Sequence, residues 1–274
     1  MNSGDFQLVE YLVIFFILGG VGGFASGLFG IGGGILRIPI FALLFPAFGI
    51  HGSMEMHVAA ATSLALAVPS GVLALRKHTR LGNFDPNYFR TWAIGLVIGV
   101  LVGIAASRYV SEGFLKTAFI AFLLAMAVYF GLVPDRCVVA KKQPTGPAKG
   151  VLSAFIGAYC VMIGIAGGSL ATPVLKLCSL SMARALAIGS GTSMVISAFG
   201  TFGGIWNGWE MPGRPAWAFG YVDTLLFLVM IPGVIFITPL GVGVGSRINA
   251  RTLRCAYSIF LVVIAATMIV HTWK

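Results

Sequence analysis

The sequence is poor in charged residues, and this scarcity excludes an ordinary soluble domain. Charged side chains make up 9% of the 274 residues, whereas a soluble domain carries roughly 25%. Hydrophobic residues reach 58% and the mean hydropathy is +0.97. So few charges cannot solvate a globule of this length. The composition therefore predicts a protein that crosses a membrane several times.

Cysteines and recognisable catalytic motifs are also scarce. The four cysteines show no CxxC spacing and no paired histidines, so we expect neither a disulfide nor a metal site. The chain has no Walker A motif, which argues against a transporter driven by ATP. We expect a protein that is not an enzyme and that uses no cofactor.

Uncharged apolar runs predict an all-α polytopic membrane protein. A membrane-spanning helix needs about 20 apolar residues. The runs place five helical segments in each half of the chain, near residues 8–29, 31–48, 57–75, 91–109, 115–133, 150–165, 168–180, 185–206, 223–245 and 254–272.

A duplicated glycine motif indicates that the two halves are related. Gly30–Pro39 reads GIGGGILRIP, and Gly164–Pro173 reads GIAGGSLATP, with six of ten positions identical. Further matches follow in the same order along the chain, including Gly95 with Gly233 and Gly103 with Gly241. We therefore expect a first transmembrane repeat over 1–135, a cytoplasmic linker over 136–149 and a second repeat over 150–274.

Basic loops predict the orientation of these repeats. Three loops are rich in Lys and Arg, which are retained on the cytoplasmic side of a membrane. They contain Arg76, Lys77, Arg80 and Arg90, then Arg136, Lys141, Lys142 and Lys149, then Arg247, Arg251 and Arg254. Placing them in the cytoplasm gives inverted repeats with both termini outside. If the glycine segments are re-entrant and do not span the membrane, the termini are expected to lie in the cytoplasm instead.

The glycine motifs predict helix breaks inside the membrane. Glycine weakens a helix by about 1 kcal/mol relative to alanine, and several together favour a break. Unpaired backbone groups are tolerated at membrane depth only against protein or a water-filled cavity. A helix that begins there directs N–H groups and a positive dipole end at an anion. The alternative is that the glycines serve close helix packing.

Polar residues near the motifs complete a predicted anion site. Its residues are Gly32, Gly33, Gly34, Arg37, Thr62, Ser63, Gly167, Gly168, Ser169, Thr192 and Ser193. A charge within a span indicates function, although Arg37 could instead snorkel to a membrane face. The hydroxyls could instead bond their own helix backbones.

Two other polar groups have simpler interpretations. His51, Glu55 and His57 are expected to lie in a solvated loop at the outer face. Asp85 and Asp223 each open a segment and are expected to cap helix N-termini.

The same motifs resemble the TauE/SafE family of sulfite-exporter-like membrane proteins. The resemblance rests on Gly30–Pro39, His57–Ser63, Gly164–Pro173 and Gly189–Ser193, and it extends over essentially the whole chain. It implies transport of sulfur-containing anions, such as sulfite or organosulfonates, across the bacterial inner membrane.

These observations together predict a secondary transporter, most simply an exporter, of small oxyanions by alternating access. With the inside negative by about 100 mV, each exported negative charge releases about 2.3 kcal/mol, so ion coupling is not obligatory. The expected partners are a small anionic substrate and the lipid bilayer, with a homodimer left open. The net charge of +10 is attributed to membrane orientation and not to nucleic acid. The alternative is an integral-membrane enzyme or assembly factor that handles sulfur or metal.

Overall fold

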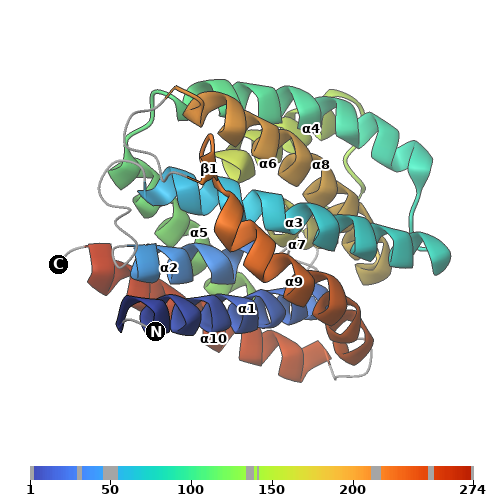
Figure 1. The fold of residues 1–274 in the computed structure, drawn as a ribbon. Coiled ribbons are helices and arrows are strands. Elements are labelled where there is room, and N and C mark those ends of the chain that lie inside the picture. Colours follow the sequence, from blue (N-terminus) through green and yellow to red (C-terminus); the bar gives the residue numbers. More distant parts are fainter. Residues whose placement is uncertain are drawn as a thin grey trace.

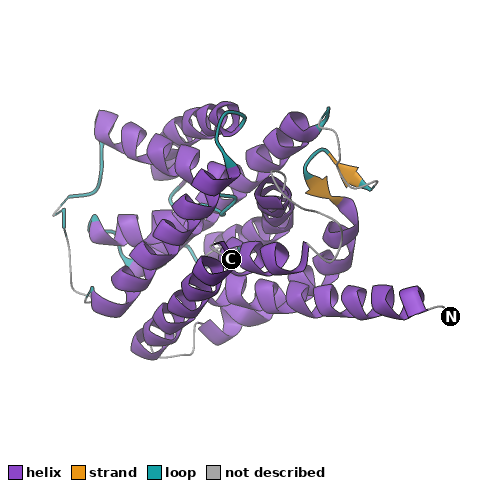
Figure 2. Cartoon of the chain, turned by 90° about the vertical axis from the view of Figure 1, so that its left-hand side faces the viewer, coloured by secondary structure: helices purple, strands orange, loops and turns teal. Residues whose placement is uncertain are grey.

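A computed structural model describes residues 3–29, 33–45, 55–133, 139–140, 142–210, 217–245 and 250–272. This part of the chain forms ten helices and one short two-stranded hairpin (Figures 1 and 2). The protein is therefore an all-α polytopic membrane protein, as the sequence predicts.

Each half contributes five helices, and each helix lies over one predicted segment. The first half contains α1 (Ser3–Phe29), α2 (Gly34–Leu44), α3 (Glu55–Arg80), α4 (Pro86–Ser107) and α5 (Glu112–Leu132). The second half contains α6 (Gly146–Met162), α7 (Gly168–Leu177), α8 (Met182–Gly208), α9 (Thr224–Gly245) and α10 (Ala250–Thr272). Strands β1 (Ala218–Phe219) and β2 (Val222–Asp223) pair antiparallel between α8 and α9.

Helix length separates two kinds of element. Among the described residues, α3, α4, α5, α8 and α9 are long and apolar enough to span a membrane. By contrast, α2 has 11 residues and α7 has 10. At 1.5 Å per residue these two helices reach about 16 Å, roughly half of a 30 Å hydrocarbon core. Both follow a glycine motif directly.

Local chemistry sets several helix starts. The carboxylate of Asp85 accepts a hydrogen bond from the Tyr88 N–H at 3.0 Å, and Asp223 accepts one from the Leu226 N–H at 3.0 Å. These contacts satisfy N–H groups that a helix start leaves without intrahelical partners. The predicted N-capping role of both aspartates is confirmed.

Close glycine contacts join α4 to α6 and α1 to α9. A Cβ added at Gly103 would lie 2.7 Å from the carbonyl oxygen of Ala158. A Cβ added at Gly241 would lie 3.0 Å from the backbone nitrogen of Leu28. Because glycine has no side chain, the helix backbones can approach each other this closely. Gly103 and Gly241 are matched positions of the two halves, and they make equivalent contacts.

Helices α3 and α8 cross at the centre of the bundle and run antiparallel. Gly71 of α3 faces the backbone of Met194, and Gly200 of α8 faces the side chain of Leu64. Helices α5 and α10 form a second antiparallel pair, in which the Ser258 hydroxyl donates to the carbonyl of Ala127. Both pairs join helices that correspond between the halves.

The bundle has two distinct ends. We call the end at which α1 begins and α10 finishes the terminal end, because both chain termini lie there (Figure 1). We call the opposite end the linker end, because Val139 and Ala140, which lie between α5 and α6, bond to the end of α7 there. The linker end also holds the turn between α3 and α4, so two of the predicted basic loops share one end.

Each glycine break joins two helices that run out and back. The carbonyl of Leu177, where α7 finishes, accepts hydrogen bonds from Val139 and Ala140, in the linker that precedes α6. Helices α1 and α2 form the corresponding pair at the terminal end (Figure 1). A pair that returns to its own end leaves the side of the membrane unchanged. The membrane side of the termini stays a prediction, and so does the inverted repeat, which these contacts support.

Candidate functional site

The second glycine motif breaks the backbone between α6 and α7. Gly164 adopts a φ of 73°, a left-handed conformation that glycine tolerates without steric cost. The chain reverses there and resumes as a helix at Gly168. A Cβ at Gly164 would collide with Cα and Cβ of Ala60 in α3, so space as well as conformation requires glycine.

The first motif makes a corresponding break before α2. Gly33 has a φ of 74° and directly precedes the helix that starts at Gly34. Gly32 lies outside the described residues. The helix breaks predicted from both glycine motifs are therefore present in the described structure.

The two motifs meet although they are far apart in sequence. A Cβ added at Gly34 would lie 3.2 Å from the carbonyl oxygen of Gly164 and 3.3 Å from Cα of Ile165. The same position lies 3.1 Å from the Ser63 hydroxyl oxygen of α3. The two short helices thus start from one buried region beside the α3/α8 crossing.

Two serines at matched positions stand at these helix starts. Ser193 accepts a hydrogen bond from the N–H of Gly168 at 2.8 Å. Ser63 lies beside Gly34, and its hydroxyl has no hydrogen-bond partner among the described residues. Ser63 is 0% exposed and Ser193 is 2% exposed. A buried hydroxyl without a partner costs about 1–3 kcal/mol, so Ser63 marks a place for water or ligand.

The two threonines are engaged within the protein. Thr192 donates to the carbonyl of Ile188 at 2.8 Å and accepts from the indole N–H of Trp92 at 3.0 Å. Thr62 accepts a hydrogen bond from the N–H of Asp223 at 2.9 Å. The threonines therefore connect the α3/α8 pair to α4 and to the start of α9, and their role in anion binding stays a prediction.

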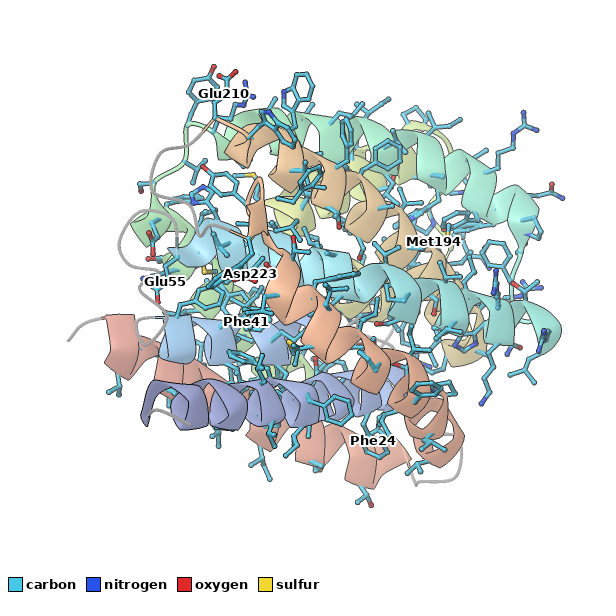
Figure 3. The ribbon with its side chains drawn as sticks, viewed as in Figure 1. Phe24, Phe41, Glu55, Met194, Glu210 and Asp223 are labelled. Carbon is cyan, nitrogen blue, oxygen red and sulfur yellow. The ribbon has the colours of Figure 1, made fainter. Side chains whose placement is uncertain are left out.

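Asp223 lies between α3 and the start of α9, as its position near α3 in Figure 3 shows. Burial raises the pKa of its carboxyl group above the usual value, while hydrogen bonds from the backbone N–H groups of Leu226 and Leu225 lower it. The carboxylate is thus held at the helix start at some cost in desolvation.

Two further predicted site residues make local contacts. The hydroxyl of Ser169 donates to the carbonyl of Ala166 at 3.0 Å, within its own motif. Gly167 packs against α8, and a Cβ there would lie 2.8 Å from Cγ2 of Thr192. Both residues shape the break and lie next to the buried region where the motifs meet.

Arg37 is completely buried and lies behind the first motif. It is 0% exposed, so it does not snorkel to a membrane face. A Cβ at Gly22 of α1 would lie 3.1 Å from its Nε, and one at Gly33 would lie 3.0 Å from its Cζ. Two glycines therefore make room for the guanidinium. Arg37 is not among the described residues that line the large cavity.

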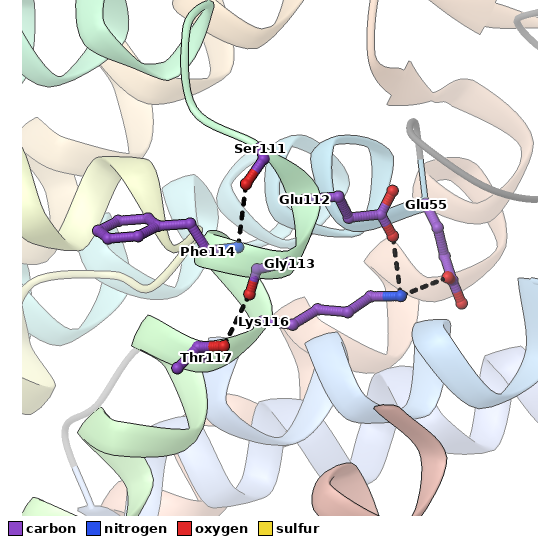
Figure 4. Close-up of polar contacts among 7 residues, drawn as sticks. All are labelled: Glu55, Ser111, Glu112, Gly113, Phe114, Lys116 and Thr117. Atoms are coloured by element: carbon purple, nitrogen blue, oxygen red, sulfur yellow. Dashed lines mark hydrogen bonds and ion pairs between the residues drawn. The ribbon is translucent and has the colours of Figure 1, made fainter. Parts of the chain in front are cut away.

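Glu55 and His57 correct one expectation from the sequence. Both lie on α3, and Glu55 is buried, so a solvated loop is wrong for these two residues; His51 lies outside the described part. Nζ of Lys116 lies 2.9 Å from Glu55 and 2.8 Å from Glu112, joining α3 to α5 (Figure 4). The ammonium group compensates for the buried charge of Glu55.

A cavity of about 860 Å³ opens at the terminal end of the bundle. Its walls come from α3, α4, α5, α6 and α8, and they include His57 of α3 and Tyr221 of the hairpin. The rings of these two residues lie 5.3 Å apart between centroids. Ala60 also lines the cavity, and it contacts Gly164. The cavity therefore reaches the region where the glycine motifs meet.

Several residues of this region carry no signal in the sequence. Trp92, Arg108 and Asn207 make side-chain contacts with residues about a hundred positions away, and none belongs to a short motif. In the sequence, only the matched threonines and serines indicate the region in which these three residues lie. No group of three or more His, Cys, Asp or Glu that could hold a metal occurs in the ranges that the structure describes.

Membrane-length helices, two buried breaks and a cavity that reaches them define a membrane transporter. The chain belongs to the sulfite exporter TauE/SafE family, whose model matches residues 15–268.

Curated relatives agree with this class. The chain is 26% identical to a probable membrane transporter protein of Haemophilus influenzae, over 95% of this chain and 99% of the relative. It is 26% identical to a probable membrane transporter protein of Methanocaldococcus jannaschii, over 97% and 98%. It is 23% identical to one of Bacillus subtilis, over 94% and 97%. The comparison with solved structures finds no match.

Proposed function

We propose that the protein is a secondary transporter that exports small sulfur oxyanions, such as sulfite or organosulfonates, across the bacterial inner membrane. The family model is described as a sulfite exporter, which supports the substrate class. Alternating access of two inverted repeats around the buried glycine motifs carries the anion from the linker end to the terminal end.

One observation carries this proposal: Gly34 and Gly164, from the two glycine motifs, meet beside the unpartnered hydroxyl of Ser63. Helices α2 and α7 begin there, and a helix N-terminus carries partial positive charge that favours an anion. Discontinuous helices that point their N-termini at an anionic substrate group are a recurring transporter design. The Ser63 hydroxyl adds a neutral donor that burial has already removed from water.

The access route and the charge distribution support the direction of transport. The cavity reaches the motifs from the terminal end, whereas two of the three predicted cytoplasmic loops lie at the linker end. In this proposal the present conformation is the one open toward the outside. Export of an anion down an inside-negative potential of about 100 mV releases about 2.3 kcal/mol per charge, which needs no coupled ion.

Flux measured in proteoliposomes tests this function. Wild-type protein is expected to carry sulfite or a short organosulfonate at a rate that rises with membrane potential. Ser63→Ala is expected to lower this flux at least several-fold. Ser70→Ala is the matched control, because Ser70 is buried on the same helix and its hydroxyl donates to the Leu66 carbonyl at 3.1 Å. Absence of flux for every sulfur oxyanion tested with well-folded wild-type protein would refute the function.

A further inference from the structure

The large cavity contains an oriented guanidinium near its mouth. Among the described residues that line this cavity, Arg108 is the only Lys or Arg side chain. It follows the last residue of α4, and its side chain is exposed to the cavity. The buried Arg37, which the sequence singled out, is not part of this lining. A positive group is therefore present in the cavity, at a place that no sequence motif marks.

Asn207 of α8 holds this guanidinium in place. Its Oδ1 accepts a hydrogen bond from Nε of Arg108 at 2.7 Å. Its Nδ2 donates to the Ile104 carbonyl at 3.0 Å and to the Ser107 hydroxyl at 3.1 Å. Asn207 is thus fixed to the end of α4 and fixes Arg108 in turn. The described structure shows no other hydrogen bond of Arg108, which leaves both terminal nitrogens for a ligand.

Two carboxylates, Glu112 and Glu210, line the cavity together with Arg108. Glu112 is 2.8 Å from Nζ of Lys116, which also pairs with Glu55, so this group of three side chains keeps one negative charge. Glu210 is exposed at the edge of the molecule, near the top of Figure 3. The pKa of the Tyr221 hydroxyl is raised by burial, and the charge of Arg108 acts in the opposite direction. Arg108 is thus the positive group, among the described residues, of a cavity lining that also carries negative charge.

We propose that Arg108, positioned by Asn207, forms an outer binding subsite for the –SO₃ group of the transported anion. The inference rests on the proposed function and adds a second binding position between the glycine motifs and the outside. An arginine fork matches two oxygens of such a group, and hydrogen bonds between charged groups are about twice as strong as neutral ones. The apolar walls at Ile104 and Trp206 accommodate the carbon chain of an organosulfonate.

The subsite joins the two halves of the chain. Arg108 comes from the first half and Asn207 from the second, so relative movement of the halves would separate the guanidinium from the amide that orients it. Binding at the subsite therefore favours the conformation in which the cavity is open at the terminal end.

Calorimetry in detergent, with sulfite and ethanesulfonate as separate probes, tests the subsite. Arg108→Gln is expected to weaken binding by about tenfold or more, because it removes a charge-assisted contact. Arg90→Gln is the matched control, since Arg90 is exposed on the same helix at the opposite end. A stronger effect for ethanesulfonate than for sulfite would assign the subsite to organosulfonates, and the reverse would assign it to sulfite.

Two further variants test charge and orientation separately. Asn207→Asp places a carboxylate against Arg108 and is expected to weaken binding as strongly as Arg108→Gln while leaving the arginine in place. Glu210→Gln removes a negative charge near the cavity and is expected to strengthen binding slightly at low salt, because exposed charges are screened at high salt. Thermal melting of each variant identifies those that fail to fold.

The outcomes distinguish this inference from the function on which it rests. If wild-type protein transports the probes and Arg108→Gln and Asn207→Asp both bind them with unchanged affinity, the subsite is refuted and the function stands. If folded wild-type protein neither binds nor transports any sulfur oxyanion, the proposed function fails first.

Discussion

Gly34 and Gly164 lie in contact at the centre of the protein, although they belong to different halves of the chain. A Cβ on Gly34 would come within 3.2 Å of the Gly164 carbonyl oxygen. Neither residue lies in the middle of a helix, because one begins α2 and the other ends the turn after α6. The contact lets two half-length helices start from one buried region, so its loss should affect both halves together.

The first prediction concerns the left-handed backbone at this contact. Gly164→Ala is expected to destabilise the protein by clearly more than 2 kcal/mol and to abolish flux. An alanine in this conformation costs about 1–2 kcal/mol, and here it also collides with Ala60. Thermal or denaturant unfolding in detergent measures the change.

Gly82→Ala is the control for this prediction. Gly82 has a φ of 70°, but nothing lies within 4 Å of an added Cβ. Gly82→Ala should therefore lose only the stability that the left-handed conformation costs an alanine, and it should retain flux. Equal losses of stability in the two variants would show that the contact with Ala60 contributes nothing.

The second prediction uses the different surroundings of two matched serines. Ser193→Ala removes the acceptor of the buried Gly168 N–H and is expected to cost about 1–3 kcal/mol of stability. Ser63→Ala removes a hydroxyl without a described partner, so it should leave the unliganded protein as stable or slightly more so. Unfolding of both variants in the absence of anions checks this. A large loss for Ser63→Ala would reveal a structural partner for its hydroxyl.

The helices could be predicted from sequence because lipid imposes long uncharged runs. Every predicted segment overlaps one helix, and the glycine motifs mark the breaks at Gly33 and Gly164. The hairpin at 218–223 was not predicted, because strands of two residues leave no alternating pattern. Glu55 was assigned to a loop because a charge usually indicates solvent. Its partner Lys116 lies on another helix, where sequence spacing gives no guide.

The candidate site was predictable only where the chain repeats itself. Duplication singled out the glycines, Ser63 and Ser193, which the fold places at the two helix starts. It could not reveal that Thr192 pairs with Trp92, because that contact joins α8 to α4 without any local motif. Arg108 and Asn207 were missed for the same reason. A charged residue at the end of a span is normally interpreted as one that lies at the membrane interface.

The third prediction concerns Arg37, whose charge the sequence assigned to the anion site. Arg37→Gln is expected to lower stability by about 0.5–3 kcal/mol, because it removes part of a completely buried side chain that packs against Gly22 and Gly33. Among variants that fold, its effect on anion affinity should be smaller than that of Arg108→Gln, since Arg37 does not line the described cavity. Calorimetry and melting on the same samples separate the two effects. A tenfold loss of anion affinity without loss of stability would show that Arg37 belongs to the binding site after all.

The fourth prediction concerns the link between α4 and α8. The Trp92 indole donates to Thr192 at 3.0 Å, and both side chains are completely buried. Trp92→Phe and Thr192→Val should each lower the free energy of unfolding by about 1–3 kcal/mol. Trp92→Phe leaves a packing defect beside the Thr192 hydroxyl, and Thr192→Val leaves the buried indole N–H without its acceptor. The double variant should cost less than the sum by about 1 kcal/mol. Additive losses would mean that the hydrogen bond carries no net stability.

The last prediction concerns the orientation of the halves in the membrane. Thr79 and Trp217 are matched positions 138 residues apart, and both are exposed. Thr79 lies near the linker end of α3, whereas Trp217 lies next to the hairpin at the terminal end (Figure 1). Thr79→Cys and Trp217→Cys, in a variant lacking the native cysteines, should therefore react with a membrane-impermeant thiol reagent from opposite sides. The basic loops place Thr79 in the cytoplasm.

Two reference positions make this labelling decisive. Val139→Cys in the linker should react from the same side as Thr79→Cys, and Tyr109→Cys should react from the same side as Trp217→Cys. Their side chains are 77% and 89% exposed, so weak labelling cannot be attributed to burial. In intact cells only Tyr109→Cys and Trp217→Cys should react, and permeabilisation should expose the other two. Reaction of Thr79→Cys and Trp217→Cys from one side would show that the halves share one orientation, and the transport mechanism proposed from inverted repeats would then be lost.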